Sequence, residues 1–538
     1  MRKRILSIAG GMLSRGCESM HARILSILLL ALCAGPLRSA PAPAPPPAET
    51  PAEASARALR ADLDRIFADA DLSRTVVAAR VLSLGPKGGE PRVLYSLRAD
   101  RPLVPASTTK LVTTAACWDR LGPDWRIRTR VGRIPAEKKG APPDLVVLGG
   151  GDPNFSGRFY ADDPVGAFRQ WARVLKARGL TAFGRILLDD RLFEAEVVHP
   201  HWPADQRQEW YEAPAGAVNL NDNCVDVCLA PGKAGEAALV RLVPATAYIA
   251  LDNQIRTVSE KGGHRYSLVR EILGLGLPGM RIRAVGAYWT GAAPAVQNVA
   301  VADPTLYFGS ALLETLRAEG LRVAGPALRA AVVTPEGVPE GFTCDLVHAS
   351  RLDATIAVAN KRSQGMYAEC LLKLLGAFAS NPGAEYGSAS AARRPRLASW
   401  NTGRAEAMRW LADRGIPADG LVLDDGSGLS KENRLTALAV TELLRVMVER
   451  HGEAFIGTLA VAGRDGSLRS RMRNTAAEGN VYGKTGYVAG TSALSGCVRT
   501  RAGRWIVFSI LMNDVPWGEL WRARAAQDKV CIRLVDYE

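Results

Sequence analysis

The pattern of the chain changes twice along its length, and this change constrains the fold more than any other feature. Apolar residues recur at helical spacing near residues 57–67 and again after residue 354, whereas residues 136–344 carry short apolar runs separated by Gly, Pro and Asp. Helical spacing indicates helices that bury one face, and short apolar runs between turn residues indicate strands. The order predicts helices packed against a sheet, with a large β-rich insertion in the middle.

The composition narrows the class of protein further. A length of 538 residues allows about three domains, or one domain with large insertions. The 47% of apolar and 23% of charged residues provide ample material for a core and exclude global disorder. The net charge of +14 comes without any run rich in Lys and Arg, so we expect no binding to nucleic acid.

The first forty residues have the order of a secretory signal. Arg23 precedes an apolar run at residues 24–33, and small and helix-breaking residues follow at 34–40. Ten apolar residues are too few for the roughly 20 that a membrane-spanning helix needs, so we expect export without a stable membrane span. Met20 is an alternative start. Lipidation at Cys33 is not favoured, because Leu32 is a poor residue at that position.

Individual elements follow from the local patterns. Residues 41–56 are rich in Pro and Ala and predict an extended linker. A helix at 59–67 and two paired strands at 75–84 and 92–97 should follow. The other expected strands are 145–148, 185–188, 240–243, 296–301, 483–498 and 504–512, with the strand that holds Lys484 paired to 505–512, and the other expected helices are 354–359, 366–378, 404–414, 436–449 and 519–534.

Ser107 and Lys110 are the first candidate catalytic residues. They lie three apart at the start of a predicted helix, so the Lys110 amine can reach the Ser107 hydroxyl. A serine hydroxyl needs an adjacent base at neutral pH, and a lysine can serve if burial or a second cation lowers its pKa. On its own, Ser-x-x-Lys more often means a helix-capping Ser beside a solvated Lys.

Two further polar segments add weight to this pair. Lys484, Thr485 and Gly486 begin a candidate strand, where they can supply a fixed cation, a hydroxyl for a substrate carboxylate, and a close approach to the backbone. Ser363 lies between the two in sequence, in a polar loop that leads into a predicted helix. The three segments together predict one serine-based site.

These three segments, in this order, resemble the Ser-x-x-Lys, Ser-Asp-Asn and Lys-Thr-Gly motifs of serine penicillin-recognising enzymes. The flanking sequence is similar to the D-alanyl-D-alanine carboxypeptidase/endopeptidase family, the class C low-molecular-mass penicillin-binding proteins, over residues 57–538. Supporting matches lie at residues 150–153, 187–190, 213–214, 220–223, 425–430 and 462–467.

The resemblance implies a role for each residue of the motifs. Ser107 would be the acylated nucleophile, Lys110 its base, and Ser363 the relay of protons to the leaving amine. The substrate-binding group would be Lys484 and Thr485 for the terminal carboxylate, Gly486 for close approach, and the backbone N–H of Tyr487, with that of Ser107, for the oxyanion.

One position departs from the family pattern. The middle motif of the family ends in Asn, whose side chain would bind the substrate amide and help to hold the active-site lysine, and this chain has Gly365 there. Loss of one positioned polar group at an active site can cost several kcal/mol. A slow enzyme, or a cell-wall-binding protein that no longer turns over, is therefore one alternative.

The resemblance also implies the architecture and the biology. The fold class would be α/β (α+β), a penicillin-binding/serine β-lactamase-like transpeptidase domain with helices packed on an antiparallel sheet and large β-rich inserted modules. We expect an exported D,D-peptidase of the periplasm or cell envelope that acts on peptidoglycan stem peptides and cross-links, is inhibited by β-lactams, and uses no cofactor. A serine β-lactamase or esterase is the other alternative. The expected divisions are a signal region (1–40), a linker (41–56), the catalytic domain in two parts (57–135 and 345–538) and the inserted modules (136–344).

Other signals are weaker. His199 and His201 can bind a metal, but no carboxylate or Cys lies near them in sequence, so we expect two surface histidines and no metal site. The Gly-rich residues 149–153 lack the features of a phosphate-binding loop and predict a turn. Trp202, Trp210 and Tyr211 can stack on sugars, although packing between modules is the commoner use of such residues. No Gly-x-Ser-x-Gly occurs, which argues against a Ser-His-Asp hydrolase of the elbow type.

Seven cysteines follow the signal region, an odd number, so one must be unpaired or paired between chains. Cys224 and Cys228 can close a small loop, and the competing interpretation is a set of buried thiols.

Overall fold

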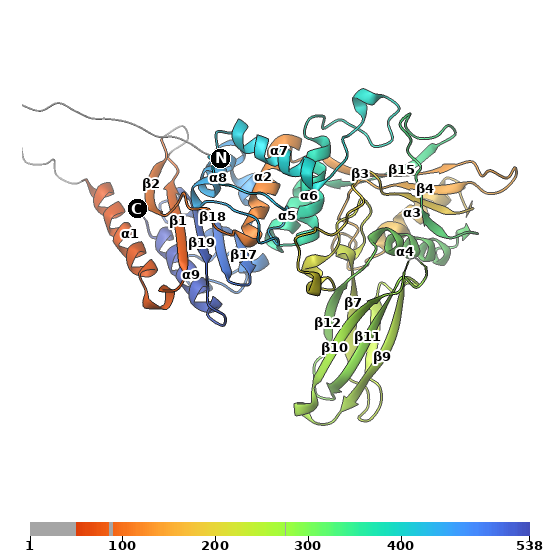
Figure 1. Cartoon of the computed structure of the whole chain (residues 1–538), viewed down its shortest axis with the longest axis horizontal. Coiled ribbons are helices and arrows are strands. Elements are labelled where there is room, and N and C mark those ends of the chain that lie inside the picture. Colours follow the sequence, from red (N-terminus) through yellow and green to blue (C-terminus); the bar gives the residue numbers. More distant parts are fainter. Residues whose placement is uncertain (1–49, 86–89, 275, 538) are drawn as a thin grey trace, which may run out of the picture. The chain divides into compact units, whose positions relative to one another are not determined.

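The computed structural model describes residues 50–85, 90–274 and 276–537 (Figure 1). The signal region, the linker as far as residue 49 and the predicted turn at residues 86–89 lie outside the described residues. From Pro51 onward the chain forms a single structural unit. Within the described ranges, every helix is too short or too polar to cross a lipid bilayer.

A six-stranded antiparallel sheet contains the strand that holds Lys484. Its order is β16-β17-β18-β19-β1-β2, so the N-terminal strand β1 lies beside the C-terminal strand β19, with Val76 opposite Asn513 (Figure 1). The strands are β1 (Val76–Ser83), β2 (Arg92–Leu97), β16 (Ala460–Val461), β17 (Val481–Val488), β18 (Thr491–Arg499) and β19 (Trp505–Asn513).

Helices cover both faces of this sheet. In β19 the side chains of Phe508 and Ile510 pack with α1 and α9, whereas the alternate residue Val507 belongs to the core of α2 and α5 to α8. Such alternation is expected of a strand buried on both sides, and each fully buried large apolar side chain contributes about 1.5–3 kcal/mol. The helices are α1 (Pro51–Phe67), α2 (Lys110–Leu121), α5 (Leu352–Lys361), α6 (Gly365–Phe378), α7 (Trp400–Asp413), α8 (Ala437–Ile456) and α9 (Leu520–Val535).

The middle of the chain forms a second set of sheets. A five-stranded sheet has the order β14-β6-β4-β3-β15, and smaller sheets have the orders β10-β11-β9, β12-β7-β8 and β13-β5. The strands are β3 (Arg126–Ile134), β4 (Asp144–Leu148), β5 (Ala182–Phe183), β6 (Ile186–Asp189), β7 (Cys224–Ala230), β8 (Leu239–Val243), β9 (Ile249–Val258), β10 (Arg265–Ile272), β11 (Met280–Trp289), β12 (Ala295–Ala300), β13 (Arg322–Val323), β14 (Ala327–Arg329) and β15 (Thr343–Arg351).

Two helices, α3 (Gly166–Ala177) and α4 (Pro304–Ala318), pack against the five-stranded sheet. The region is β-rich as predicted, but neither of these two helices was predicted. In α3 the buried residues Phe168, Trp171, Ala172 and Leu175 recur at helical spacing, a pattern that predicts a helix. In α4 the side chain of Asp303 caps the first turn.

The predicted fold class is confirmed: helices pack on an antiparallel sheet, and a β-rich insertion interrupts the chain. The division at residues 135/136 and 344/345 stays a prediction. Because β3 pairs with both β4 and β15, its sheet contains residues from both sides of each proposed boundary.

Three local predictions need correction. Residues 483–498 are not one strand but the hairpin of β17 and β18, which turns at Gly490 with φ +82°. As a result β17 pairs with β18, and it is β18 that pairs with β19. The helix α1 begins at Pro51, so the last residues of the expected extended linker are helical; Pro is well tolerated in the first turn and Ala favours a helix.

All seven described cysteines are free thiols. Cys224 and Cys228 both lie on β7, where an extended strand places residues four apart at roughly 13 Å. A disulfide joins Cα atoms less than about 7 Å apart, so these two cannot pair on this strand. The interpretation as thiols in the core is confirmed for Cys117, Cys370 and the others that are buried.

Candidate active site

Ser107 lies in a short 3-10 turn, Ala106–Thr109, that leads directly into α2. The turn is held from the opposite side by the loop at Gly428. A Cβ on Gly428 would lie 1.9 Å from the Ala106 carbonyl oxygen, so only glycine allows this close approach. Ser107 is half-buried and faces an open cavity, while the residues around it are buried.

Lys110 occupies the first position of α2 and is 1% exposed. Its Nζ donates to Ser107 Oγ at 3.1 Å and to the Ser427 carbonyl oxygen at 2.7 Å. Burial lowers the pKa of Lys110 to about 8, although the carboxylates of Glu369 and Asp425 act in the opposite direction. At pH 7 roughly one tenth of this amine is therefore neutral, the form that can accept the Ser107 proton.

Lys484 forms a second amine–hydroxyl pair in the same region. Its Nζ donates to Ser363 Oγ at 2.8 Å and to the Thr485 carbonyl oxygen at 2.7 Å. The side chain is fully buried, and burial together with the nearby cation of Lys110 holds the pKa of Lys484 well below its usual range. Ser363 has φ +59°, a left-handed conformation in the turn between α5 and α6.

The remaining motif residues lie on β17. The Thr485 hydroxyl donates to Ser467 Oγ at 2.8 Å, and Tyr487 is 56% exposed. A Cβ on Gly486 would lie 2.6 Å from the Pro105 carbonyl oxygen, so glycine lets the Ser107 turn approach the strand. The strand β16 pairs with β17 only as far as Gly483. From Lys484 onward, β18 is the single described strand that pairs with β17, so the other edge of β17 is open.

One cavity of about 620 Å³ brings most of the predicted residues together. Ser107, Lys110, Ser363, Thr485 and Tyr487 all line it. Lys484 does not line the cavity but reaches it through its hydrogen bond to Ser363. Gly486 lies behind, against the turn that carries Ser107.

Sequence reasoning missed the groups that hold the loop at Ser427. The carboxylate of Glu369, on α6, accepts the N–H groups of Gly426 and Ser427 at 2.9 and 2.7 Å. The carboxylate of Asp425 accepts those of Gly428 and Ser430, each at 2.7 Å. The Asp-Gly-Ser-Gly segment at 425–428 was noted only as a supporting match, and it was a signal that could have identified this loop.

Gly365 begins α6 and lines the cavity next to Ser363. A Cβ at this position would lie 3.0 Å from the Tyr211 carbonyl oxygen and 3.9 Å from the Ser427 side chain. The space that an Asn side chain would need is therefore constrained by backbone from the inserted region. The second contact of Lys110 is the Ser427 carbonyl instead.

The aromatic and histidine residues of segment 199–211 fall into two groups. His199 and Trp202 are each 3% exposed and pack with Trp400, so the prediction of a surface position is wrong for His199. The His201 side chain is 55% exposed and lines the cavity, as do Trp210 and Tyr211. Packing between segments is thus confirmed for Trp202.

The arrangement places a nucleophile beside a base, and a second hydroxyl beside a second amine, at the edge of a sheet. Such a site can carry out acyl transfer to serine, because Lys110 can accept a proton while the Lys484 and Ser363 pair can deliver one. The amines and hydroxyls are also hydrogen-bond donors that suit a substrate with a carboxylate.

The comparisons with known proteins agree with this chemistry. A model of the D-Ala-D-Ala carboxypeptidase 3 (S13) family matches residues 59–530. A D-alanyl-D-alanine carboxypeptidase of Actinomadura sp. (strain R39) is 32% identical over 499 residues, which are 89% of this chain and 85% of that protein. Carboxypeptidase DacB of Mycolicibacterium smegmatis is 26% identical over 78% of this chain and 74% of its own length.

The fold is also shared with a solved structure. Penicillin-binding protein 4 (dacB) from Haemophilus influenzae superposes with a TM-score of 0.70 at 21% identity, over 89% of this chain and 99% of that chain. That protein has also been solved in complex with a β-lactam.

Proposed function

We propose a function for this chain, which belongs to the D-Ala-D-Ala carboxypeptidase 3 (S13) family and is a serine peptidase of the penicillin-binding type. It removes the terminal D-alanine from peptidoglycan stem peptides and cleaves D,D-cross-links. Both reactions pass through an acyl-enzyme on Ser107. The observation that carries the proposal is the pairing of two buried amines with two hydroxyls in one region, Lys110 with Ser107 and Lys484 with Ser363.

The first half of the reaction forms the acyl-enzyme. Ser107 Oγ attacks the carbonyl carbon between the two D-alanines, and its proton passes to the Lys110 amine, 3.1 Å away. The backbone N–H groups of Ser107 and Tyr487 meet the oxyanion. The C–N bond then breaks, and the leaving D-alanine amine takes up, through Ser363, the proton that Lys110 had received, so Lys110 is neutral again.

The second half restores the enzyme. A water molecule gives a proton to Lys110 and attacks the ester carbonyl, and Lys110 returns that proton to Ser107 Oγ as the ester bond breaks and the shortened peptide leaves. Lys484 and the Thr485 hydroxyl hold the terminal carboxylate of the substrate, whose chain lies along the open edge of β17. Gly486 supports this position, since it lets β17 lie close to the Ser107 turn.

The site of action follows from the substrate. A peptidoglycan peptidase acts outside the cytoplasm, and we propose that the first forty residues export the chain to the periplasm or cell envelope. β-Lactams resemble the terminal D-alanyl-D-alanine in having a carboxylate near a reactive amide, so they should acylate Ser107 and inhibit the enzyme.

The test combines three measurements on the untagged chain and on Ser107→Ala. We expect stable labelling by a fluorescent penicillin, an adduct on the Ser107 peptide in mass spectrometry, and release of D-alanine from a D-Ala-D-Ala pentapeptide, all lost in Ser107→Ala. The exposed Ser73→Ala is the control and should behave as the wild type.

Other outcomes contradict the proposal in different ways. An adduct on another residue removes Ser107 as nucleophile. Rapid release of hydrolysed penicillin without D-alanine release makes the protein a β-lactamase. A stable adduct without D-alanine release makes it a binding protein that no longer turns over.

A further inference from the structure

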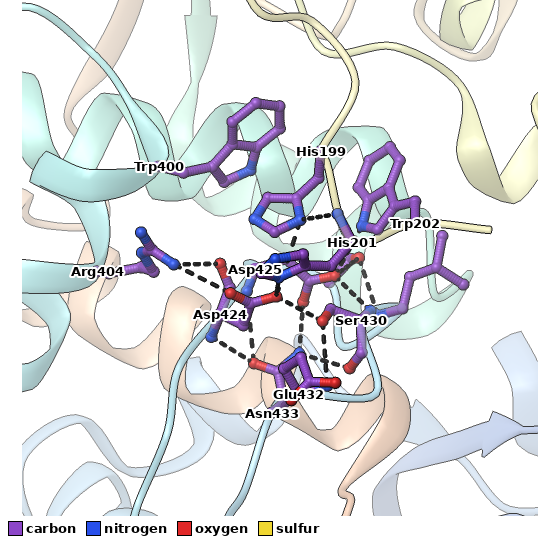
Figure 2. Close-up of polar contacts among 12 residues, drawn as sticks. His199, His201, Trp202, Trp400, Arg404, Asp424, Asp425, Ser430, Glu432 and Asn433 are labelled. Atoms are coloured by element: carbon purple, nitrogen blue, oxygen red, sulfur yellow. Dashed lines mark hydrogen bonds and ion pairs between the residues drawn. The ribbon is translucent and has the colours of Figure 1, made fainter. Parts of the chain in front are cut away.

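Three side chains with metal-binding atoms converge at the rim of the active-site cavity. One ligand atom from each of His199, His201 and Asp424 lies within 4.8 Å of the others (Figure 2). The histidines come from the inserted region, and Asp424 comes from the second catalytic segment, 223 residues after His201. This distance in sequence explains why no carboxylate was evident beside the two histidines.

The geometry centres on one carboxylate oxygen. Asp424 Oδ2 lies 2.8 Å from His201 Nδ1 and 3.8 Å from His199 Nδ1. Zinc in proteins binds histidine nitrogens at about 2.0–2.1 Å and carboxylate oxygens at about 2.0–2.2 Å. Small rotations of the side chains therefore suffice for all three to reach one ion between them.

The residues around the cluster orient two of its members. Arg404 and the Asn433 amide hold Asp424: the guanidinium donates to Asp424 Oδ1 at 3.1 Å, and Asn433 Oδ1 accepts the Asp424 N–H at 2.8 Å. The His199 ring is fixed by Trp400, with ring centroids 4.9 Å apart and planes at 88°. Such outer contacts, which fix a ligand in place, are a general feature of metal sites.

Three hydrogen bonds use atoms that a metal would need, and one of them joins His201 Nδ1 to Asp424 Oδ2 at 2.8 Å. The His201 N–H donates to His199 Nδ1 at 3.3 Å, and the Ser430 hydroxyl donates to Asp424 Oδ2 at 2.5 Å. The hydrogen bond to His199 Nδ1 is long, and the one from Ser430 uses only one lone pair of Asp424 Oδ2. The exposed His201 side chain has room to turn, so an ion can replace its hydrogen bond to Asp424.

The donor set selects among metals. Two imidazoles and one carboxylate suit zinc, whereas calcium and magnesium prefer all-oxygen sites with more carboxylates. The guanidinium of Arg404 on the same carboxylate further disfavours a cation that depends on charge alone. We propose that His199, His201 and Asp424 form a three-ligand zinc site that joins the inserted region to the loop of the active site.

The location gives the site a role. Asp424 is followed by Asp425, whose carboxylate accepts the N–H groups of Gly428 and Ser430. The loop that these hydrogen bonds hold also carries the Ser427 carbonyl, which accepts from Lys110. His201 and Glu432 line the cavity itself. Zinc bound here fixes the rim of the cavity, which both regions form.

The experiment measures zinc binding directly in the untagged chain. We expect isothermal titration and elemental analysis after dialysis to give one zinc per chain, and Co²⁺ to give the visible absorption bands of a site with nitrogen ligands. His201→Gln should weaken zinc binding by at least about 100-fold. Zinc should also raise the thermal midpoint of the wild type but not that of His201→Gln.

His264→Gln is the matched control, because His264 is an exposed histidine on a different part of the inserted region. It retains every cysteine thiol, so metal bound by thiols appears equally in all variants. Asp424→Asn gives a second removal of a ligand with a side chain of the same shape. Absence of stoichiometric zinc in the wild type, or equal affinity in His201→Gln and His264→Gln, overturns the proposal and leaves the cluster as a hydrogen-bonded contact.

Discussion

Lys484 Nζ lies 2.8 Å from Ser363 Oγ, although 121 residues separate the two in sequence. This pair is joined electrostatically to Lys110, because the nearby cation of Lys110 adds to burial in lowering the pKa of Lys484. Two buried ammonium groups disfavour each other, and neutral amine is the form that a serine nucleophile requires. The proximity of the two motifs therefore acts on Lys484, whereas burial alone lowers the pKa of the base Lys110.

The rate of acylation should rise with pH. The pKa of Lys110 is lowered to about 8, and the base acts only when it has lost its proton, so the rate should increase through about pH 8 and then level off. The measurement is the second-order rate of labelling by a fluorescent penicillin from about pH 6 to about pH 10. Circular dichroism over the same range controls for unfolding, and a rate that is flat or falls contradicts the assignment of Lys110 as base.

Lys484→Met should lower the rate without moving its pH profile. The rate should fall by about 10²–10³, since a positioned charge at the substrate carboxylate is lost. The inflection should stay near about pH 8, because burial lowers the pKa of Lys110 and the charges that act on it are the carboxylates of Glu369 and Asp425. A shift of the inflection would contradict this and show that Lys484 also sets the pKa of the base.

Glu369→Gln should destabilise the protein and slow acylation. The carboxylate accepts two backbone N–H groups of the loop that carries the Ser427 carbonyl, and an amide can accept with only one of its two ends. One unsatisfied buried group costs about 1–3 kcal/mol. Urea unfolding and acylation rates test both effects. Glu449→Gln, at an exposed position on α8, is the control and should change neither.

Gly365→Asn should not accelerate the enzyme. Lys110 already has the Ser427 carbonyl as its second partner, and any side chain at position 365 meets the Tyr211 carbonyl, 3.0 Å from the Cβ. We expect a lower thermal midpoint and unchanged or slower D-alanine release, with Gly365→Ala intermediate in stability. A clear gain in turnover would show instead that the missing amide limits catalysis.

Glu212→Gln should stabilise the protein at neutral pH and above. Glu212 is fully buried, neither of its carboxylate oxygens has a hydrogen-bond partner among the described residues, and burial raises its pKa from the ordinary 4.5 to about 7. Arg207 and Arg270 oppose this shift, and Asp205 and Glu209 add to it. A raised pKa gives a stability contribution that is complete below about 4.5 and is lost as pH rises through about 7.

Glu212→Gln has no carboxyl group to ionise at this position. Its thermal midpoint should therefore exceed that of the wild type only as pH rises from about 4.5 through about 7. Glu449→Gln again serves as control, since its exposed carboxylate has a counterpart in Arg445. An equal advantage at about pH 4 and about pH 8 would exclude the carboxylate charge as its cause.

The sequence alone predicted the features that are local or that carry a motif. Ser107 and Lys110 are three residues apart, so helical geometry by itself predicts their contact. The strands at 76–83 and 92–97 and the final helix were predicted almost to the residue, because their apolar periodicity is strong. The link between these residues and Lys484 depended on the family resemblance, since no local rule relates positions so far apart.

The features that the sequence did not predict involve groups that no local pattern distinguishes. The second partner of Lys110 is a backbone carbonyl, and a carbonyl is present at every residue, so Ser427 carries no distinguishing mark. Glu369 lies in a predominantly apolar helix, where nothing marks it as a loop partner. Asp424 is far in sequence from the histidines that it lies beside in the structure. The hairpin at Gly490 was missed because the residues on both sides of it are equally strand-like.

The pairing of β1 with β19 has a consequence for the newly made chain. The nucleophile is synthesised early, but the strands that complete its sheet, β17 to β19, all come after residue 480. During translation Ser107 therefore emerges long before Lys484. Nascent or C-terminally truncated chains cannot assemble the site, so the cell is not exposed to an active peptidase before synthesis has passed β19.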